Sequence, residues 1–337
     1  MDFTKEKTNI AKGLAICLMF SHHLYAFPKR LLHGNYYIPM IPFFNAEYHL
    51  GIFGSICVSM FLFLSGYGMF LGYNSYLKSP ILYTWKKLKE LYLTYWLYFL
   101  IFVPIGLIFF KDVTLWKSNE IRYSTEWRTL VENFLGWSTT YNQEWWFVRM
   151  FVLLLIFLCP LYLVLSKQNL VLLSLLSLSI FIYSLILNVS YHSPLGFMFL
   201  QISFTTGIVC AKVKFFSSRF VQYFDDNLKE FGVFFGIVVC FLLQINFGRK
   251  IEFLLMPLFI YFVIRAISAL HLSKLLAYIG VYSFPLWLVH SFFCYYYFQD
   301  IIYFPRWSPL IFVSLMGVSL LSVLSIEYLR SRLKIFI

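Results

Sequence analysis

Two side chains near the start of the chain have types and a spacing that suit proton-transfer chemistry. Lys12 and His23 are 11 residues apart. In an α-helix this separation turns by about 20° more than three full turns, so the two share a face and lie about 16 Å apart along the axis. Burial disfavours a charged imidazole, which leaves His23 able to accept a proton. We predict His23 as a general base and Lys12 as a cation on the same stripe, whereas His22 points about 80° away from it.

That pattern also has a purely structural interpretation. Lys12 can extend its amine toward a polar surface, and His23 can hydrogen-bond a neighbouring helix. The residues alone leave the two interpretations open.

Other polar residues also lie inside apolar stretches, where ionisable groups are costly and therefore candidates for function. His290 follows Pro285 in one such stretch and can line a site or be a satisfied structural histidine. Arg149, close to Trp146, can hold a polar or anionic substrate or pair with Glu144. The sequence predicts substrate-binding roles for His290, Arg149 and Trp146 but does not separate these alternatives.

The elements that position these residues must be membrane helices. Of the residues, 61% are hydrophobic and 12% are charged, against roughly 25% charged in a soluble domain. A bilayer-crossing helix needs about 20 mainly apolar residues. Ten segments qualify, namely 10–27, 52–73, 91–110, 146–166, 169–187, 196–212, 231–247, 252–270, 276–298 and 309–328. We therefore predict an all-α polytopic membrane protein with about ten transmembrane helices, one domain over residues 1–337 and no separate soluble domain.

The formal net charge of +12 comes from short basic clusters between apolar runs. Positively charged loops remain in the cytoplasm, so both termini are predicted to be cytoplasmic and residues 111–145 to face outward. Clusters without a continuous basic face argue against nucleic-acid binding. The six cysteines lie in apolar runs without a CxxC pair, so we expect neither a disulfide nor a metal site.

Five blocks of sequence, in order along nearly the whole chain, resemble the signatures of one family. The first runs from Lys12 to Ile16 and on to His22 and His23. The others are residues 61–67 (Phe-Leu-Phe-Leu-Ser-Gly-Tyr), 86–89 (Lys-Lys-Leu-Lys), 145–147 (Trp-Trp-Phe) and 282–290 (Tyr-Ser-Phe-Pro-Leu-Trp-Leu-Val-His). Together they resemble acyltransferase family three, integral membrane enzymes that O-acylate bacterial surface polysaccharides. The family has Arg-x-x-Arg where this chain has Lys86 and Lys89, which keep the charge but lose bidentate geometry.

The resemblance implies an O-acyltransferase, and within the family an O-acetyltransferase, that uses acetyl-CoA. His23, helped by Lys12, would be the general base for a glycan hydroxyl or would carry an acyl-histidine intermediate. CoA is a cytoplasmic polyanion, so Lys86 and Lys89 would bind its phosphates unless they only set topology. The block at residues 61–67 would bring Ser65 and Gly66 to the thioester, with close helix packing as the alternative.

The expected location is the bacterial cytoplasmic (inner) membrane, with membrane lipid and a polysaccharide or lipid-linked glycan acceptor as partners. Two alternatives share this composition. A transporter or flippase of lipid-linked glycan would show paired halves and discontinuous helices, and a glycan polymerase would have a larger, arginine-rich outer loop. No heptad or GxxxG face stands out, so the oligomeric state stays open, as do the sugar, the hydroxyl and the acyl length.

Overall fold

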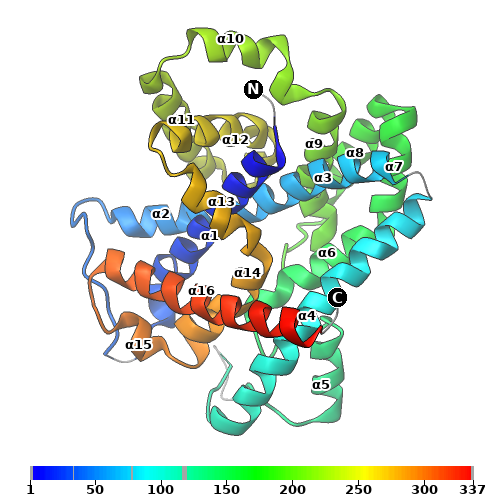
Figure 1. Ribbon diagram of the computed structural model, residues 1–337. Helices are drawn as coiled ribbons and strands as arrows, with labels where there is room; N and C mark the ends of the chain where they lie inside the picture. The colour runs from blue at the N-terminus through cyan, green and yellow to red at the C-terminus, as the bar shows by residue number, and fades with distance from the viewer. Residues whose placement is uncertain (1–2, 33, 77–78, 116–119, 335–337) are drawn as a thin grey trace. The chain divides into compact units, whose positions relative to one another are not determined.

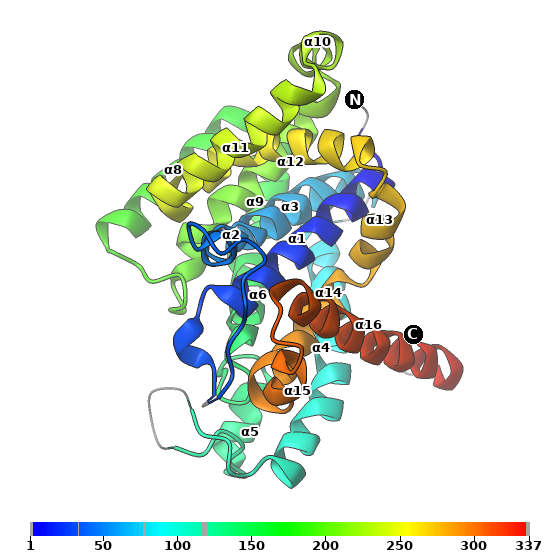
Figure 2. The ribbon, with the colours of Figure 1, turned by 90° about the vertical axis from the view of Figure 1, so that its left-hand side faces the viewer.

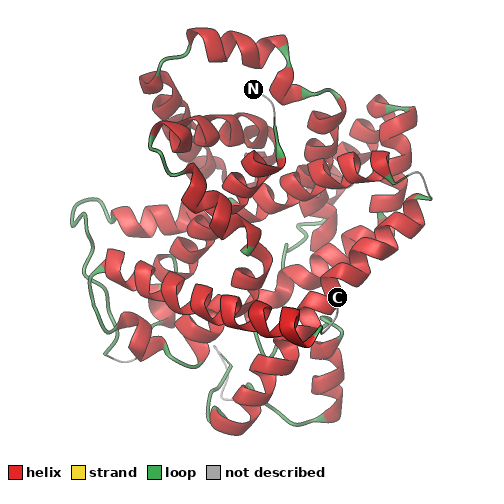
Figure 3. Cartoon of the chain, viewed as in Figure 1, coloured by secondary structure: helices red, strands yellow, loops and turns green. Residues whose placement is uncertain are grey.

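The computed structural model describes residues 3–32, 34–76, 79–115 and 120–334. Within these ranges the chain consists of helices joined by loops, with two isolated β-bridges and no strand (Figure 3). The prediction of an all-α fold is confirmed. The chain divides into two compact units, each assembled from three separate segments.

Unit 1 comprises Met1–Leu18, Ser55–Lys87 and Met150–Val281. Its helices, labelled in Figure 1, are α3 (Cys57–Ser75), α7 (Cys159–Gln168), α8 (Leu170–Ile186), α9 (Gly196–Lys212), α10 (Arg219–Asn227), α11 (Glu230–Phe247), α12 (Glu252–Ala269) and α13 (Ser273–Val281). Helix α3 packs against α9, and α11 against α12, as both ribbon views show (Figures 1 and 2).

Unit 2 comprises Met19–Gly54, Leu88–Arg149 and Tyr282–Ile337. Its helices are α2 (Ala46–Gly54), α5 (Trp127–Phe134), α14 (Ser283–Ser291), α15 (Gln299–Tyr303) and α16 (Ser308–Leu333). A short π-helix, Phe292–Tyr296, continues α14, and α14 and α15 both pack against α16 (Figure 2). Three further helices contribute residues to both units, namely α1 (Lys5–Tyr25), α4 (Pro80–Phe109) and α6 (Trp146–Phe157).

Close helix packing in unit 1 explains one of the predicted sequence blocks. A Cβ atom on Gly66 of α3 would lie 1.9 Å from the carbonyl oxygen of Phe204 in α9, and one on Gly207 would lie 2.0 Å from that of Phe63. No side chain fits at such distances, so glycine is required for the two backbones to approach. Ser65, the neighbour of Gly66, is partly buried.

The expected number of about ten spans is not confirmed. Among the described residues, four helical stretches are long and apolar enough to cross a membrane, and two bent pairs could add two more. The four stretches are Ala46–Ser75, Pro80–Phe109, Glu230–Ala269 and Ser308–Leu333. The bent pairs are Gln143–Phe157 with Cys159–Gln168, and Ser273–Val281 with Ser283–Tyr296.

The predicted segments and these candidate spans differ because apolarity does not reveal where a helix breaks. The predicted segment 146–166 bends by 50° at the break before Cys159, next to Pro160, which cannot donate a backbone hydrogen bond. The predicted segments 231–247 and 252–270 correspond to α11 and α12, which pack against each other although they belong to one apolar stretch, Glu230–Ala269. Two more, α8 and α9, are apolar but shorter helices.

Candidate functional site

Two histidine rings meet in unit 2. His23, near the end of α1, lies with its ring centroid 4.8 Å from that of His290 in α14. His290 is fully buried, and its Nδ1 lies 2.7 Å from the carbonyl oxygen of Trp287. A carbonyl only accepts, so Nδ1 carries the proton and Nε2 is left as an acceptor in the neutral ring. That Nε2 is buried without a hydrogen-bond partner among the described residues, which leaves one acceptor of the site unsatisfied.

Tyr295 of the π-helix determines which nitrogen of His23 can act as a base. Its hydroxyl donates to the backbone carbonyl of His23 and also lies 3.4 Å from His23 Nδ1. The single hydroxyl proton is used by the carbonyl, so toward Nδ1 the oxygen can only accept. This arrangement favours the tautomer in which Nδ1 carries the hydrogen and Nε2 carries the lone pair.

An ion pair lies beside these histidines. Arg30 donates to Glu144 at 2.8 Å, and the two side chains are only 9% and 4% exposed. The consecutive tyrosines of the π-helix hold both members, because the Arg30 guanidinium lies 3.7 Å from the ring centroid of Tyr295 and the Tyr296 hydroxyl donates to Glu144. Burial opposes the charge on Arg30, but the Glu144 carboxylate outweighs it and raises the pKa of Arg30. The pair therefore stays charged although it is buried.

A second arginine adds positive charge to this cluster. Arg122 is 2% exposed, lies 4.2 Å from the ring centroid of Tyr296 and donates to the carbonyl of Thr140 at 2.8 Å. With two arginines and one glutamate, the cluster has an excess of positive charge that can stabilise a developing negative charge. We call His23, Arg30, Arg122, Glu144, His290, Tyr295 and Tyr296 the histidine cluster.

His22 has a different role from His23. Its Nδ1 lies 2.8 Å from the carbonyl oxygen of Gly51 in α2, within the same unit. Because the carbonyl accepts, this nitrogen donates and ties α1 to α2. His22 was predicted to point away from the face that carries His23, and its hydrogen bond to α2 gives it a structural role there.

Lys12 belongs to unit 1, where the charges of Lys5 and Lys87 act on it. Lys86, at 5.6 Å from the ring centroid of Tyr76, and Lys89 are both exposed on α4. The structure thus brings Lys87 toward Lys12. Lys87 belongs to the predicted basic block at residues 86–89, but it is not one of the two positions that match the family's Arg-x-x-Arg. Like charges in one place attract an anion.

Arg149 and Trp146 lie on the first turns of α6. The Nη1 atom of Arg149 donates to the carbonyl of Trp137 at 2.8 Å. Glu144, the alternative partner predicted for Arg149, is ion-paired with Arg30 instead. Arg30 was not selected from the sequence. Trp146 is partly buried, with its ring centroid 6.0 Å from that of Phe147.

Sequence reasoning did not select Arg30, Arg122, Tyr295 or Tyr296, and it considered Glu144 only as a partner for Arg149. Arg30 and Glu144 are separated by 114 positions, and nothing local indicates that they meet. The sequence offered only a weak signal for this pair. Arg30 and Glu144 each lie at the edge of an apolar segment, where a buried charge needs a partner.

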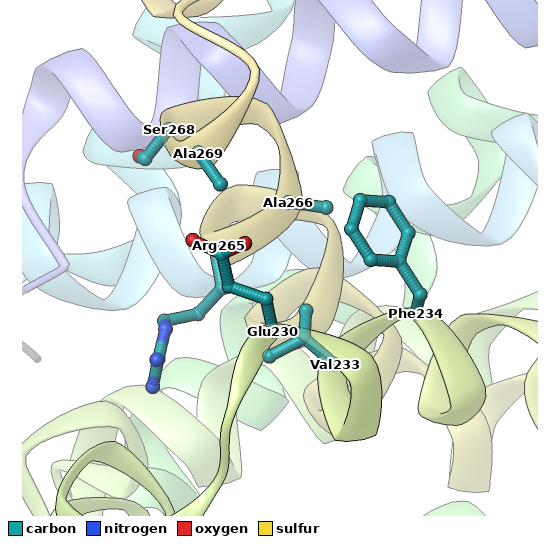
Figure 4. A pocket seen from close by; sticks show the side chains of 7 residues that line it. All are labelled: Glu230, Val233, Phe234, Arg265, Ala266, Ser268 and Ala269. Atoms are coloured by element: carbon teal, nitrogen blue, oxygen red, sulfur yellow. The ribbon is translucent and has the colours of Figure 1, made fainter.

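Unit 1 contains a pocket that involves none of the predicted site residues. Glu230, Val233 and Phe234 of α11 line it together with Arg265, Ala266, Ser268 and Ala269 of α12 (Figure 4). The guanidinium of Arg265 points away from Phe234 in this view and is bound to Asp225 at 3.1 Å. No group of three or more metal-ligating His, Cys, Asp or Glu side chains occurs in the described part of the chain.

The apolar helices and the buried histidine cluster define a multi-pass membrane protein with a charged, hydrogen-bonded interior site. A family model described as an acyltransferase domain matches residues 7–328. The chain therefore belongs to acyltransferase family three, as its five sequence blocks predicted. No curated protein and no solved structure matches it.

Proposed function

We propose that this membrane acyltransferase is an O-acetyltransferase that moves an acetyl group from acetyl-CoA to a hydroxyl of a cell-surface glycan or its lipid-linked precursor. The observation that carries the proposal is the arrangement of His23. The Tyr295 hydroxyl donates to its backbone carbonyl and lies 3.4 Å from its Nδ1, which favours a lone pair on Nε2, and the excess positive charge of the histidine cluster lies beside it.

In this mechanism, His23 Nε2 accepts the hydroxyl proton of the acceptor while the oxygen attacks the thioester carbonyl. The carbon–sulfur bond then breaks, the acyl group remains on the acceptor, and the CoA thiolate takes up a proton as His23 loses one. Arg30 and Arg122 favour the negative charge that develops on the carbonyl oxygen. His290, with an unpartnered acceptor nitrogen, suits the positioning of a substrate donor. An acyl group carried briefly by His23 is the alternative route.

For the donor, we propose that lysines bind the phosphates of CoA. Lys12, with Lys5 and Lys87 acting on it, supplies an anion-attracting group, and Lys86 and Lys89 add exposed positive charge nearby in sequence. Arg149 and Trp146 are proposed to contact the acceptor. The arrangement requires cytoplasmic termini in a bacterial inner membrane. A reporter fused after Lys89 should then report the cytoplasm and one near Glu126 the outer side, and reversal at both positions would overturn the donor model.

The direct test uses purified protein in liposomes with labelled acetyl-CoA and crude surface glycan. We expect label on the glycan with the unsubstituted protein and none above background with His23→Ala. Movement of lipid-linked glycan across the liposome membrane without labelled product would favour a flippase. Chain extension of the glycan would favour a polymerase.

A further inference from the structure

An exposed apolar segment lies between α1 and α2 in unit 2. Residues 36–44 read Tyr-Tyr-Ile-Pro-Met-Ile-Pro-Phe-Phe. The large apolar side chains exposed by more than a third are Tyr36, Ile38, Met40, Ile41, Phe43 and Phe44. Phe43 and Phe44 are 72% and 91% exposed. We call residues 36–44 the apolar lip, and a contiguous apolar surface of this kind marks an interaction site.

Backbone hydrogen bonds hold the apolar lip in one place. The backbone N–H of Ile38 donates to Arg306 O at 2.7 Å, and Ser308 N–H donates to Ile38 O at 2.9 Å. The N–H of Met40 donates to the Ser308 hydroxyl at 3.1 Å and also to the buried Glu47 carboxylate. The outward direction of the apolar side chains is therefore a feature of the fold.

The tip of the apolar lip has a costly backbone conformation. Phe44 and Asn45 have φ values of 64° and 46°, in the left-handed region. Asparagine tolerates this region, but other residues with a Cβ adopt it at a cost in free energy. Since Phe44 is 91% exposed, contacts within the chain do little to offset that cost. An apolar contact from outside the chain would offset that cost.

The neighbouring residues indicate what that contact is. The candidate membrane span Ala46–Ser75 begins two residues after Phe44, which is at most about 7 Å along the chain. Ile38 forms a β-bridge with Trp307, which lies in the segment before α16. Trp307 and Phe304 of that segment are 44% and 80% exposed, so the apolar surface continues there. Arg306, in the same segment, lies 4.6 Å from the ring centroid of Tyr36. An arginine at the border of such a surface suits lipid phosphates, and aromatic rings suit the membrane interface.

We propose that the apolar lip is inserted in the lipid bilayer, at the boundary between headgroups and acyl chains. Its base is tied to the histidine cluster, because Gln299 accepts from the Leu32 N–H at 2.6 Å and donates to the Arg30 carbonyl at 3.2 Å. The apolar lip thereby holds that cluster near the membrane surface. This inference is independent of which acyl donor or acceptor the protein uses.

The test measures the lipid contact of the tip directly. Phe44→Cys and Glu126→Cys, the latter an exposed polar position, are labelled with a bimane fluorophore in vesicles of phosphatidylethanolamine and phosphatidylglycerol that contain spin-labelled lipid. Five of the six native cysteines are buried and the sixth is only partly exposed, so the unsubstituted protein supplies a low background. We expect several-fold stronger quenching at position 44 than at position 126. Equal quenching at both positions would overturn the proposal.

A second measurement covers the case in which the cysteine variant does not fold. Phe43→Ser combined with Phe44→Asn removes the rings and places at position 44 a residue that tolerates the left-handed region. Adding the same phospholipids to detergent-solubilised protein should raise the Tm of the unsubstituted chain more than that of this variant. The same rise in both would contradict insertion of the apolar lip.

Discussion

The two ends of α1 are surrounded by different charges. In unit 1, the charges of two further lysines, Lys5 and Lys87, act on Lys12. In unit 2, Arg30 near His23 is paired with the Glu144 carboxylate, and tyrosine rings lie against both Arg30 and Arg122. A group of like charges gains most when an anion from outside the protein neutralises it, whereas a cluster whose arginines already have partners can hold its side chains in place.

The difference suggests that the two groups of side chains have separate roles, which substitutions in each group can test. Substitutions at the lysines should act on the binding of an anionic donor. Substitutions in the histidine cluster should act on the chemical step or on the stability of unit 2.

The largest effect is expected at His23. His23→Ala should lower the rate of acyl transfer by about 10²- to 10⁴-fold, because it removes the proposed general base. His22→Ala is the matched control and should cost far less activity, since His22 binds the Gly51 carbonyl instead. Turnover with labelled acetyl-CoA, normalised to inserted protein, measures both. Equal losses in the two variants would contradict the assignment.

The next largest effect concerns the buried ion pair. Arg30→Met should destabilise the protein by about 3–5 kcal/mol, because it leaves the Glu144 carboxylate buried and uncompensated. The double variant Arg30→Met with Glu144→Leu should recover much of that loss. Thermal unfolding in lipid nanodiscs measures the series.

The exposed pair Arg128 and Glu132, at 2.8 Å, offers a comparison with the same chemistry. Arg128→Met should leave the Tm almost unchanged, since the arginine is 79% exposed and solvent screens the pair. If Arg30→Met were as harmless as Arg128→Met, the Arg30–Glu144 pair would not stabilise unit 2.

A smaller effect is expected at the lysines. Lys86→Gln with Lys89→Gln should raise the KM for acetyl-CoA by about tenfold or more and leave the KM for the glycan unchanged, because charge-assisted phosphate contacts are lost. Lys87→Gln tests the group around Lys12 separately. If only Lys87→Gln raises the donor KM, the group with Lys12 binds CoA and the other two lysines do not. Mixed orientation of the double variant with normal KM would show that Lys86 and Lys89 set topology.

The smallest effect is expected at Tyr295. Tyr295→Phe keeps the ring against Arg30 but removes the hydroxyl that holds His23, so kcat should fall by about 2- to 10-fold. Because substrate contacts remain, the KM values should not change. Tyr296→Phe should instead lower the Tm through Glu144. A Tyr295→Phe enzyme with unchanged kcat would exclude a positioning role.

The sequence by itself determined the class of protein and the local placement of its first candidates. Composition requires lipid-facing helices, because so few charged residues cannot cover a soluble surface. The periodicity of the α-helix places Lys12 and His23 on one face of α1 without any knowledge of the fold. The ordered sequence blocks were sufficient to predict the family, which the match over residues 7–328 confirmed.

Only the tertiary structure decided what surrounds those residues. Glu144 reaches Arg30 across 114 positions, and Tyr295 reaches His23 across 272. Such contacts depend on how helices pack, and packing is set by many weak interactions that no single stretch of sequence records. The number of spans is left unconfirmed for a related reason: hydropathy reports how well a residue tolerates lipid, while the bend before Cys159 depends on backbone geometry. The apolar lip also depends on backbone geometry, because only the folded backbone decides that Phe43 and Phe44 are exposed.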